Sequence, residues 1–310
     1  MTFPIRASPG SRPVSPDPPY EVTAIELYVI GNPGRAASEV QVGPPPARVG
    51  PADSELSVAA VAGMEILAVS SRGLEHRAAG VVRQDAFALG LLTAPDGPDR
   101  LVAVVCDGVG SMARSDEAAL LASRRLAVLG AAGVAWPEAF ARVNSELRTV
   151  AGDAGRDVGP TDGGMATTAA ALAVHREGDD WVGEVAWVGD SALWHLDGAL
   201  RWVPLTSPPD DDMEPGFYSG EVVTLPGSDG IPATLSTRLC AGALFLMSDG
   251  IANPLRWSAD VRGTLARWWG LPPAPYTFAA QVGFARQTHV DDRTVIGIWP
   301  DRGKAHAAEV

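Results

Sequence analysis

The sequence predicts an α+β fold in which antiparallel sheets are layered with helices. From about Gly63 onwards, short apolar runs of strand-like length and β-branched content are bounded by Gly, Asp and Pro residues. Consecutive strands without intervening helices favour antiparallel sheets with helices packed outside over a doubly wound parallel sheet. Four of the runs follow one another in this way, at 167–175, 184–190, 193–196 and 243–249.

Three further runs of the same character complete the expected sheets. They span 65–71, 100–106 and 293–299. One more strand is expected within residues 20–31, where apolar and β-branched residues interrupt a proline-rich stretch.

Four segments between the strands are expected to be helical. In the first, at 115–130, Ser115 suits the N-cap, two acidic residues follow it, and two arginines lie toward its end. Charges of these signs are favourable at the two ends of a helix dipole. The others are expected at 137–150, where proline fits the first turn, and at 259–269 and 276–288.

The chain has 310 residues, of which 46% are hydrophobic, so it can form one large domain with a sizeable core. We assign residues 60–300 to that domain. Residues 1–59 are a proline-rich extension, partly disordered, which we interpret as a linker or docking arm, and residues 301–310 are a C-terminal tail. The N-terminus lacks the apolar stretch of a signal peptide, so we expect a soluble, cytoplasmic protein.

Charge and cysteine content exclude several classes of function. The formal net charge of −13 argues against partners such as nucleic acids and anionic membranes, which are held by basic surfaces. Cys106 and Cys240 lie in separate apolar runs without CxxC spacing, so neither a disulfide framework nor a zinc site is predicted.

Carboxylates stand at the ends of several strand-like runs. Asp107, Asp190 and Asp249 each close a run, Asp291 and Asp292 precede the last one, and Asp85 follows Gln84. If the strands are neighbours, these carboxylates converge at the rim of the core. Like charges in a partly desolvated site raise one another's pKa, and a divalent cation supplies the missing counter-charge.

The kinds of residue in this set indicate which metal would bind. Oxygen ligands without clustered His or Cys favour hard cations such as Mg²⁺ or Mn²⁺ over zinc. Gly108, directly after Asp107, lets the backbone approach closely, so its carbonyl could be a further oxygen ligand.

Six segments containing these residues resemble, in order, the metal-dependent protein phosphatases of the type 2C family, in a bacterial form. From the first to the last they span about three-quarters of the chain. The segments are SSRGLEHRAAGVVRQDAF (70–87), VVCDGVGS (104–111), GGMATTAAA (163–171), WVGDSALW (187–194), LMSDGI (246–251) and DDRTVIGI (291–298).

The resemblance implies a four-layer α/β-β/α sandwich, in which two antiparallel sheets are flanked by helices and a two-metal centre occupies one end. By motif position, Asp107 would bridge both metals and the Gly108 carbonyl would bind the second. Asp249 and Asp291 would bind the first. Asp190 would match the ligand of a third, weaker metal that bacterial members often show.

The activity implied by the resemblance is hydrolysis of phosphoserine and phosphothreonine in phosphorylated proteins. By this implied mechanism, the cations would activate a water for in-line attack on phosphorus, and no phosphoenzyme would be needed. Asp85 would orient metal-bound water.

The phosphate-binding side departs from the family pattern. Many eukaryotic members have a histidine just after the DG pair, where this chain has Val109, so the general acid is unassigned. A phosphate-binding arginine usually precedes the first acidic residue, and Arg77 and Arg83 both qualify, with Arg83 preferred. His76 could contact phosphate instead, and Asp292 could exchange roles with Asp291.

Two other classes of function remain as alternatives. Gly189-Asp190-Ser191 could be the nucleophile motif of a GDS-type serine hydrolase, although it lies mid-chain and His289 is only loosely placed. A catalytically silent relative that binds phosphoproteins or regulates a partner is the other alternative, and the presence of Asp107, Asp249 and Asp291 argues against it.

The polar segment 206–235 lies where the family carries a flap beside the active site, and it could shape substrate access. The substrate itself is open. Partner Ser/Thr kinases, a two-component system and an anti-sigma pathway are all compatible with the sequence.

Overall fold

A computed structural model describes residues 28–34, 43–93, 95, 97–152, 164–206, 222–227 and 231–300. Most of the strand expected at 20–31, most of the flap expected at 206–235 and the tail at 301–310 lie outside the described residues.

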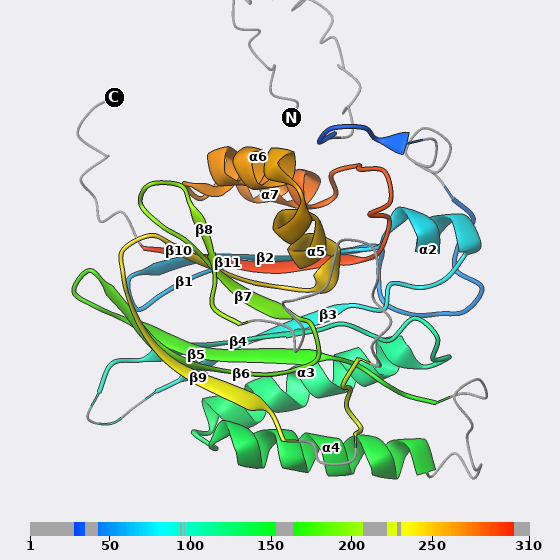
Figure 1. Cartoon of the computed structure of the whole chain (residues 1–310). Coiled ribbons are helices and arrows are strands. Elements are labelled where there is room, and N and C mark those ends of the chain that lie inside the picture. The colour runs from blue at the N-terminus through cyan, green and yellow to red at the C-terminus, as the bar shows by residue number, and fades with distance from the viewer. Residues whose placement is uncertain are drawn as a thin grey trace, which may run out of the picture.

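Two antiparallel sheets lie face to face at the centre of the molecule (Figure 1). The first has the order β1-β2-β11-β10-β7-β8, with bounds Ser54–Val61, Met64–Ser71, Arg293–Pro300, Ala243–Met247, Ala192–Leu196 and Trp202–Pro204. The second has the order β3-β4-β5-β6-β9, with bounds Ala86–Leu92, Arg100–Cys106, Ala169–Glu177, Asp180–Val188 and Ala233–Cys240.

Helices cover the outer face of each sheet, which confirms the predicted four-layer α+β sandwich (Figure 1). The second sheet is covered by α3 (Ser115–Ala131) and α4 (Trp136–Gly152). The first is covered by α5 (Asp249–Trp257), α6 (Ala259–Trp269) and α7 (Pro275–Val282). The short helix α2 (Leu74–Ala79) lies at one end of the sandwich. None of the described helices combines the length and apolar composition needed to cross a membrane.

Three apolar cores hold the layers together. Strand β4 contributes to two of them, which explains why every residue after Arg100 in this strand is apolar. Leu101, Ala103 and Val105 belong to the core between the sheets. Val102, Val104 and Cys106 belong to the core beneath α3 and α4. Because side chains alternate between the two faces of a strand and both faces are buried here, no position is left for a polar residue.

The apolar elements match their predicted positions best. Strand β4 and helix α6 have the predicted bounds, and the other expected strands shift by a few residues. Helix α7 ends at Val282, well before the expected end at 288, and the chain after it pairs with residues 28–32 instead.

Other elements were not predicted, for identifiable reasons. Strand β9 lies at the edge of its sheet and alternates with exposed positions, so its serines and threonines resemble a loop. Helix α5 contains Pro254, which normally indicates a helix end. The expected N-cap Ser115 lies within α3, whose N-cap is Arg114 with no side-chain hydrogen bond. Strands β1, β3 and β8 and helix α2 were also missed.

Candidate metal centre

The predicted acidic residues emerge at one end of the sandwich. In the second sheet, Cys106 at the end of β4 pairs with Ala86 at the start of β3. Asp107 follows Cys106 and Asp85 precedes Ala86, so the two aspartates leave the same edge. The Asp85 carboxylate then accepts a hydrogen bond from the Ser248 hydroxyl at 2.7 Å, which joins it to the end of β10 in the other sheet.

The remaining ligand candidates reach the same place from other strand ends. Met247, the last residue of β10, pairs with Val295 near the start of β11, so Asp249 and Asp291 flank this pair. Asp190 follows β6. Each of these three carboxylates raises the pKa of Asp107, so the set predicted from the strand ends is brought together.

Two glycines make this convergence possible by removing a side chain where backbones meet. A Cβ on Gly108 would lie 2.7 Å from the Gln84 carbonyl oxygen and 2.8 Å from that of Ser115. A Cβ on Gly250 would lie 1.9 Å from the carbonyl oxygen of Asp292. Heavy atoms of this kind do not approach so closely, so each DG pair requires glycine at its second position.

Asp292 holds the surrounding backbone together and is not free to bind a cation in place of Asp291. Its side chain is 2% exposed. One carboxylate oxygen accepts from the Gly73 amide at 2.6 Å and is 2.8 Å from His76 Nδ1, and the other accepts from the Gln84 amide at 2.5 Å. Asp291, by contrast, is exposed and lies beside His76.

Three supporting residues lie within or next to the quoted motifs, but sequence reasoning did not identify their roles. Asn253 donates to the Asp249 carboxylate at 3.0 Å, one helical turn along α5. Ser248, which binds Asp85, accepts in turn from the Thr294 amide at 3.0 Å. An Asn four residues after an aspartate at a helix start is a signal that could have been read.

The clustered carboxylates raise one another's pKa values. The pKa of Asp85 and of Asp107 lies well above the ordinary value, first because burial removes water and then because neighbouring carboxylates carry like charge. The same two causes raise the pKa of Asp249 to about 7 and raise that of Asp190. The pKa of Asp291 is raised as well, because protein groups surround its carboxyl although part of the residue is exposed, and because Asp292 carries like charge. The negative charge of these carboxylates is therefore not balanced by the neighbouring side chains.

A divalent cation fits this donor set. The candidate ligands are all oxygens, and the Asp107 and Asp249 carboxyls lie within hydrogen-bonding reach of one another. Within the part of the chain that the structure describes, nothing donates to the Gly108 carbonyl, while the Asp107 carbonyl accepts from Thr167 and Thr168. Hard cations such as Mg²⁺ and Mn²⁺ prefer oxygen ligands, and their charge would favour the ionised carboxylates.

The structure separates the candidates for phosphate binding. Arg83 is 2% exposed, and its guanidinium donates to the Glu55 carboxylate at 2.8 Å. Arg77 lines a small cavity together with Asp291, and Arg83 is not part of that lining. Both arginines have buried nitrogens without a partner among the described residues, so the cavity is what distinguishes Arg77. His76 lies beside the same aspartate.

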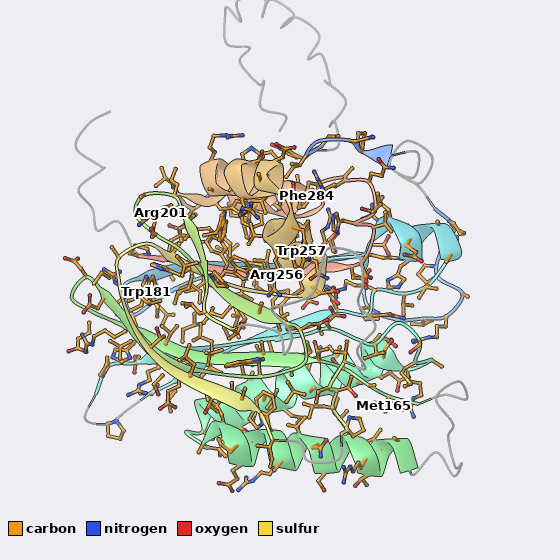
Figure 2. The ribbon with its side chains drawn as sticks, viewed as in Figure 1. Met165, Trp181, Arg201, Arg256, Trp257 and Phe284 are labelled. Carbon is orange, nitrogen blue, oxygen red and sulfur yellow. The ribbon has the colours of Figure 1, made fainter. Side chains whose placement is uncertain are left out.

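A further cation approaches the site from α5. Arg256 lowers the pKa of Asp190, opposing the larger effects of burial and of Asp291. Its guanidinium lies 5.9 Å from the centre of the Trp257 ring, and the two side chains are neighbours in Figure 2. Sequence reasoning missed this residue because it lies far along the chain from every motif aspartate except Asp249.

Ser191 lacks the surroundings of a hydrolase nucleophile. It is 1% exposed, and its hydroxyl lies 2.8 Å from that of Thr168. His289 lines the same cavity as Arg77 and Asp291, and Ser191 is not part of that lining. A serine nucleophile needs an adjacent base and access to substrate, and Ser191 has a buried threonine as its neighbour.

Sequence comparison places this geometry in a known family. The chain matches the family described as protein phosphatase 2C over residues 72–281. The chain belongs to this family. As a protein phosphatase 2C it is an enzyme of the protein-serine/threonine phosphatase class, and the GDS-hydrolase and silent-module alternatives give way to that assignment.

Solved structures share the protein phosphatase 2C fold. A bacterial serine phosphatase superposes with a TM-score of 0.56 at 15% identity, covering 76% of this chain and 98% of its own. The S. agalactiae serine/threonine phosphatase gives 0.56 at 15%, covering 79% and 99%. The catalytic domain of the serine threonine protein phosphatase PstP, in complex with two manganese ions, gives 0.52 at 20%, covering 76% and 97%. Comparison with curated proteins finds no match.

Proposed function

We propose that this chain hydrolyses phosphoserine and phosphothreonine in protein substrates, with divalent cations held by its convergent carboxylates. The observation that carries the proposal is the meeting of Asp107, Asp190, Asp249 and Asp291 at one end of the sandwich, where the last three each raise the pKa of Asp107. Such a site is poorly suited to anions until cations neutralise it. Once neutralised, it can accept a phosphoryl group.

Two cations are proposed, with Mg²⁺ and Mn²⁺ as the candidates. Asp107 would bridge them, Asp249 and Asp291 would hold one, and the Gly108 carbonyl would complete the other. Asp190 would serve a third, weaker position. Bound cations of this kind lower the pKa of water and stabilise charge that develops on a phosphoryl group.

The chain's own residues orient the reaction. Asp85, fixed by the Ser248 hydroxyl, would accept a hydrogen bond from the attacking water and align it with phosphorus. Asn253 holds the Asp249 carboxylate in one orientation. Asp292 fixes the backbone of Gly73 and Gln84, on either side of α2, and so positions the segment that carries Asp85. The general acid is left unassigned.

Removing the metal tests the proposed function. A phosphothreonine peptide is expected to be hydrolysed in the presence of Mn²⁺ or Mg²⁺ and left intact after dialysis against a chelator, with activity restored by adding the ion back. Release of inorganic phosphate measures the rate. Turnover that survives chelation would contradict a metal-dependent mechanism.

Phosphate binding distinguishes the two arginines. We propose Arg77, at the cavity beside Asp291, in place of the sequence-based preference for Arg83. Arg77→Ala is expected to raise KM for a phosphopeptide by about tenfold, as for loss of one charge-assisted hydrogen bond, with a smaller change in kcat. Arg83→Ala should instead lower the melting temperature, because it removes the buried partner of Glu55.

The Arg77 and Arg83 variants are compared in the same assay and by thermal unfolding. The opposite pattern, with KM raised only by Arg83→Ala, would restore Arg83 as the phosphate ligand.

A further inference from the structure

The segment before the family-matched region is anchored to the fold at two places. Its first contact is apolar. Ile30 is 3% exposed and belongs to the core beneath α6 and α7, and the Tyr28 ring meets that of Trp268 edge-on at 5.1 Å. The backbone of residues 28–32 also exchanges hydrogen bonds with Ala285 and Gln287, in the loop that leads to Asp291.

The second contact is polar and lies at the N-terminal end of α3. The Arg48 guanidinium binds both carboxylate oxygens of Asp116, one of them at 2.9 Å, and donates to the Ala113 carbonyl at 3.3 Å. Asp116 is 4% exposed, so it is almost wholly enclosed by this pairing and the helix. A bidentate pair of this kind fixes orientation as well as distance.

On both sides of Arg48 the same segment lies against the first motif. The Ala47 amide donates to the Gly80 carbonyl at 2.9 Å, just after α2. A Cβ on Gly43 would lie 2.1 Å from the Arg77 carbonyl oxygen, so the backbones touch. Further on, Asp53 and Glu55 pair with the buried arginines Arg72 and Arg83. We call the described residues 28–34 and 43–55 the brace; in Figure 1 they follow the α2 side of the molecule.

Both anchor points lie next to segments that carry proposed metal ligands. Arg48 contacts Ala113 and Asp116, which close the loop that starts at Gly108. The Ser115 carbonyl, between them, is one of the atoms that a Gly108 Cβ would strike. At the other anchor, residues 28–32 pair with the loop that ends at Asp291. The brace thus connects the helix layer of α6 and α7 with that of α3 at the metal-bearing end.

We propose that the brace is part of the catalytic unit and that Arg48 is a positioning residue, which holds the Gly108 loop in its cation-binding conformation through Asp116. The family match begins at residue 72, so this support lies outside the family-matched region. Arg48 acts on metal affinity through the loop and touches neither cation nor substrate.

The test is direct measurement of Mn²⁺ binding by calorimetry in the full chain. Arg48→Ala is expected to bind Mn²⁺ about tenfold more weakly, at the low end of what loss of supporting contacts costs a metal site. Asp116→Ala should have the same effect, and the double variant should be no worse than either, because the two residues act as one unit. Hydrogen exchange of residues 108–115 should quicken in all three.

Arg125→Ala is the matched control. Arg125 lies on α3, the helix that carries Asp116, and it pairs with the Glu146 carboxylate at 2.8 Å. This pair lies away from the Gly108 loop. Arg125→Ala should leave Mn²⁺ affinity unchanged. If Arg48→Ala does not fold, Arg48→Lys, which keeps the charge and loses the bidentate geometry, is expected to weaken Mn²⁺ binding by a smaller factor.

If folded Arg48→Ala binds Mn²⁺ as tightly as the wild type, the positioning role is overturned, and the Arg48–Asp116 pair contributes to stability alone. The same holds for Arg48→Lys where that variant is used. The outcome is independent of the proposed phosphatase activity, because it is read from binding of the metal. Failure of the wild-type chain to bind Mn²⁺ would instead count against the proposed function.

Discussion

Asp249→Asn is expected to abolish Mn²⁺-dependent phosphopeptide hydrolysis and, at the same time, to stabilise the metal-free protein. The substitution keeps the shape of the side chain and removes its charge, so a proposed ligand is lost without a cavity. Since changes to supporting groups alone cost metal sites about 10- to 100-fold, loss of a ligand should lower the rate by at least about a hundredfold.

The gain in stability follows from the pKa of Asp249. Burial and the neighbouring carboxylates raise this pKa from its ordinary value of 3.8 to about 7 in the folded state. Between these pH values the unfolded chain has released a proton that the folded protein still holds. The metal-free protein therefore loses stability as pH rises from about 4 to about 7, by up to about 1.4 kcal/mol per pH unit for this one group.

Urea unfolding in the presence of a chelator, at pH 5 and at pH 7.5, measures this effect. The Asp249→Asn variant should show a smaller loss between the two pH values than the wild type. Asp179→Asn, in an exposed turn, is the control and should change neither the rate nor the pH dependence. An Asp249→Asn protein that is both active and equally pH-sensitive would remove Asp249 from the site.

Gly250→Ala adds one methyl group, and we expect no other added methyl group in the site to lower stability and Mn²⁺ binding as much. Its Cβ would lie 1.9 Å from the Asp292 carbonyl oxygen, and both partners are backbone, so no side chain can move aside. Relief requires α5 to separate from the start of β11, which moves Asp249 away from Asp291. We expect a loss of about 3 kcal/mol or more in the free energy of unfolding, together with loss of tight Mn²⁺ binding.

Thermal unfolding and Mn²⁺ calorimetry on the purified variant check both parts. Gly198→Ala is the matched control, because a Cβ there meets no atom within 4 Å. A stable Gly250→Ala protein with wild-type Mn²⁺ affinity would show that the approach of the two backbones is not needed to assemble the site.

The meeting of the proposed metal ligands at one end of the sandwich could be predicted from sequence, because each stands next to a strongly apolar strand. Strand β4 is apolar on both faces, so its end, and with it Asp107, is fixed by the apolar run alone. The support for the ligands could not be predicted in this way. The Asp292 carboxylate accepts a hydrogen bond from the amide of Gly73, 219 residues away, and no local sequence pattern predicts such a contact.

The phosphate-binding side shows the same limit. Arg83 and Arg77 both qualify in the sequence, since both precede Asp85 by a short distance, and the sequence-based preference was for Arg83. What separates them is Glu55, which accepts a hydrogen bond from Arg83. Glu55 lies on a strand that the sequence did not predict. Strand β1 begins at Ser54, within the segment assigned to the extension.

The pairing of β1 with the first motif has a practical consequence for anyone who prepares fragments of this protein. A fragment cut at residue 72, where the family match begins, would keep Arg72 and Arg83 but lose Asp53 and Glu55. Two buried guanidinium groups would then lose the half-exposed carboxylates that pair with them, and the fragment would be less stable than the longer chain. Material for crystallisation or screening should therefore start upstream of Asp53, and preferably upstream of Tyr28.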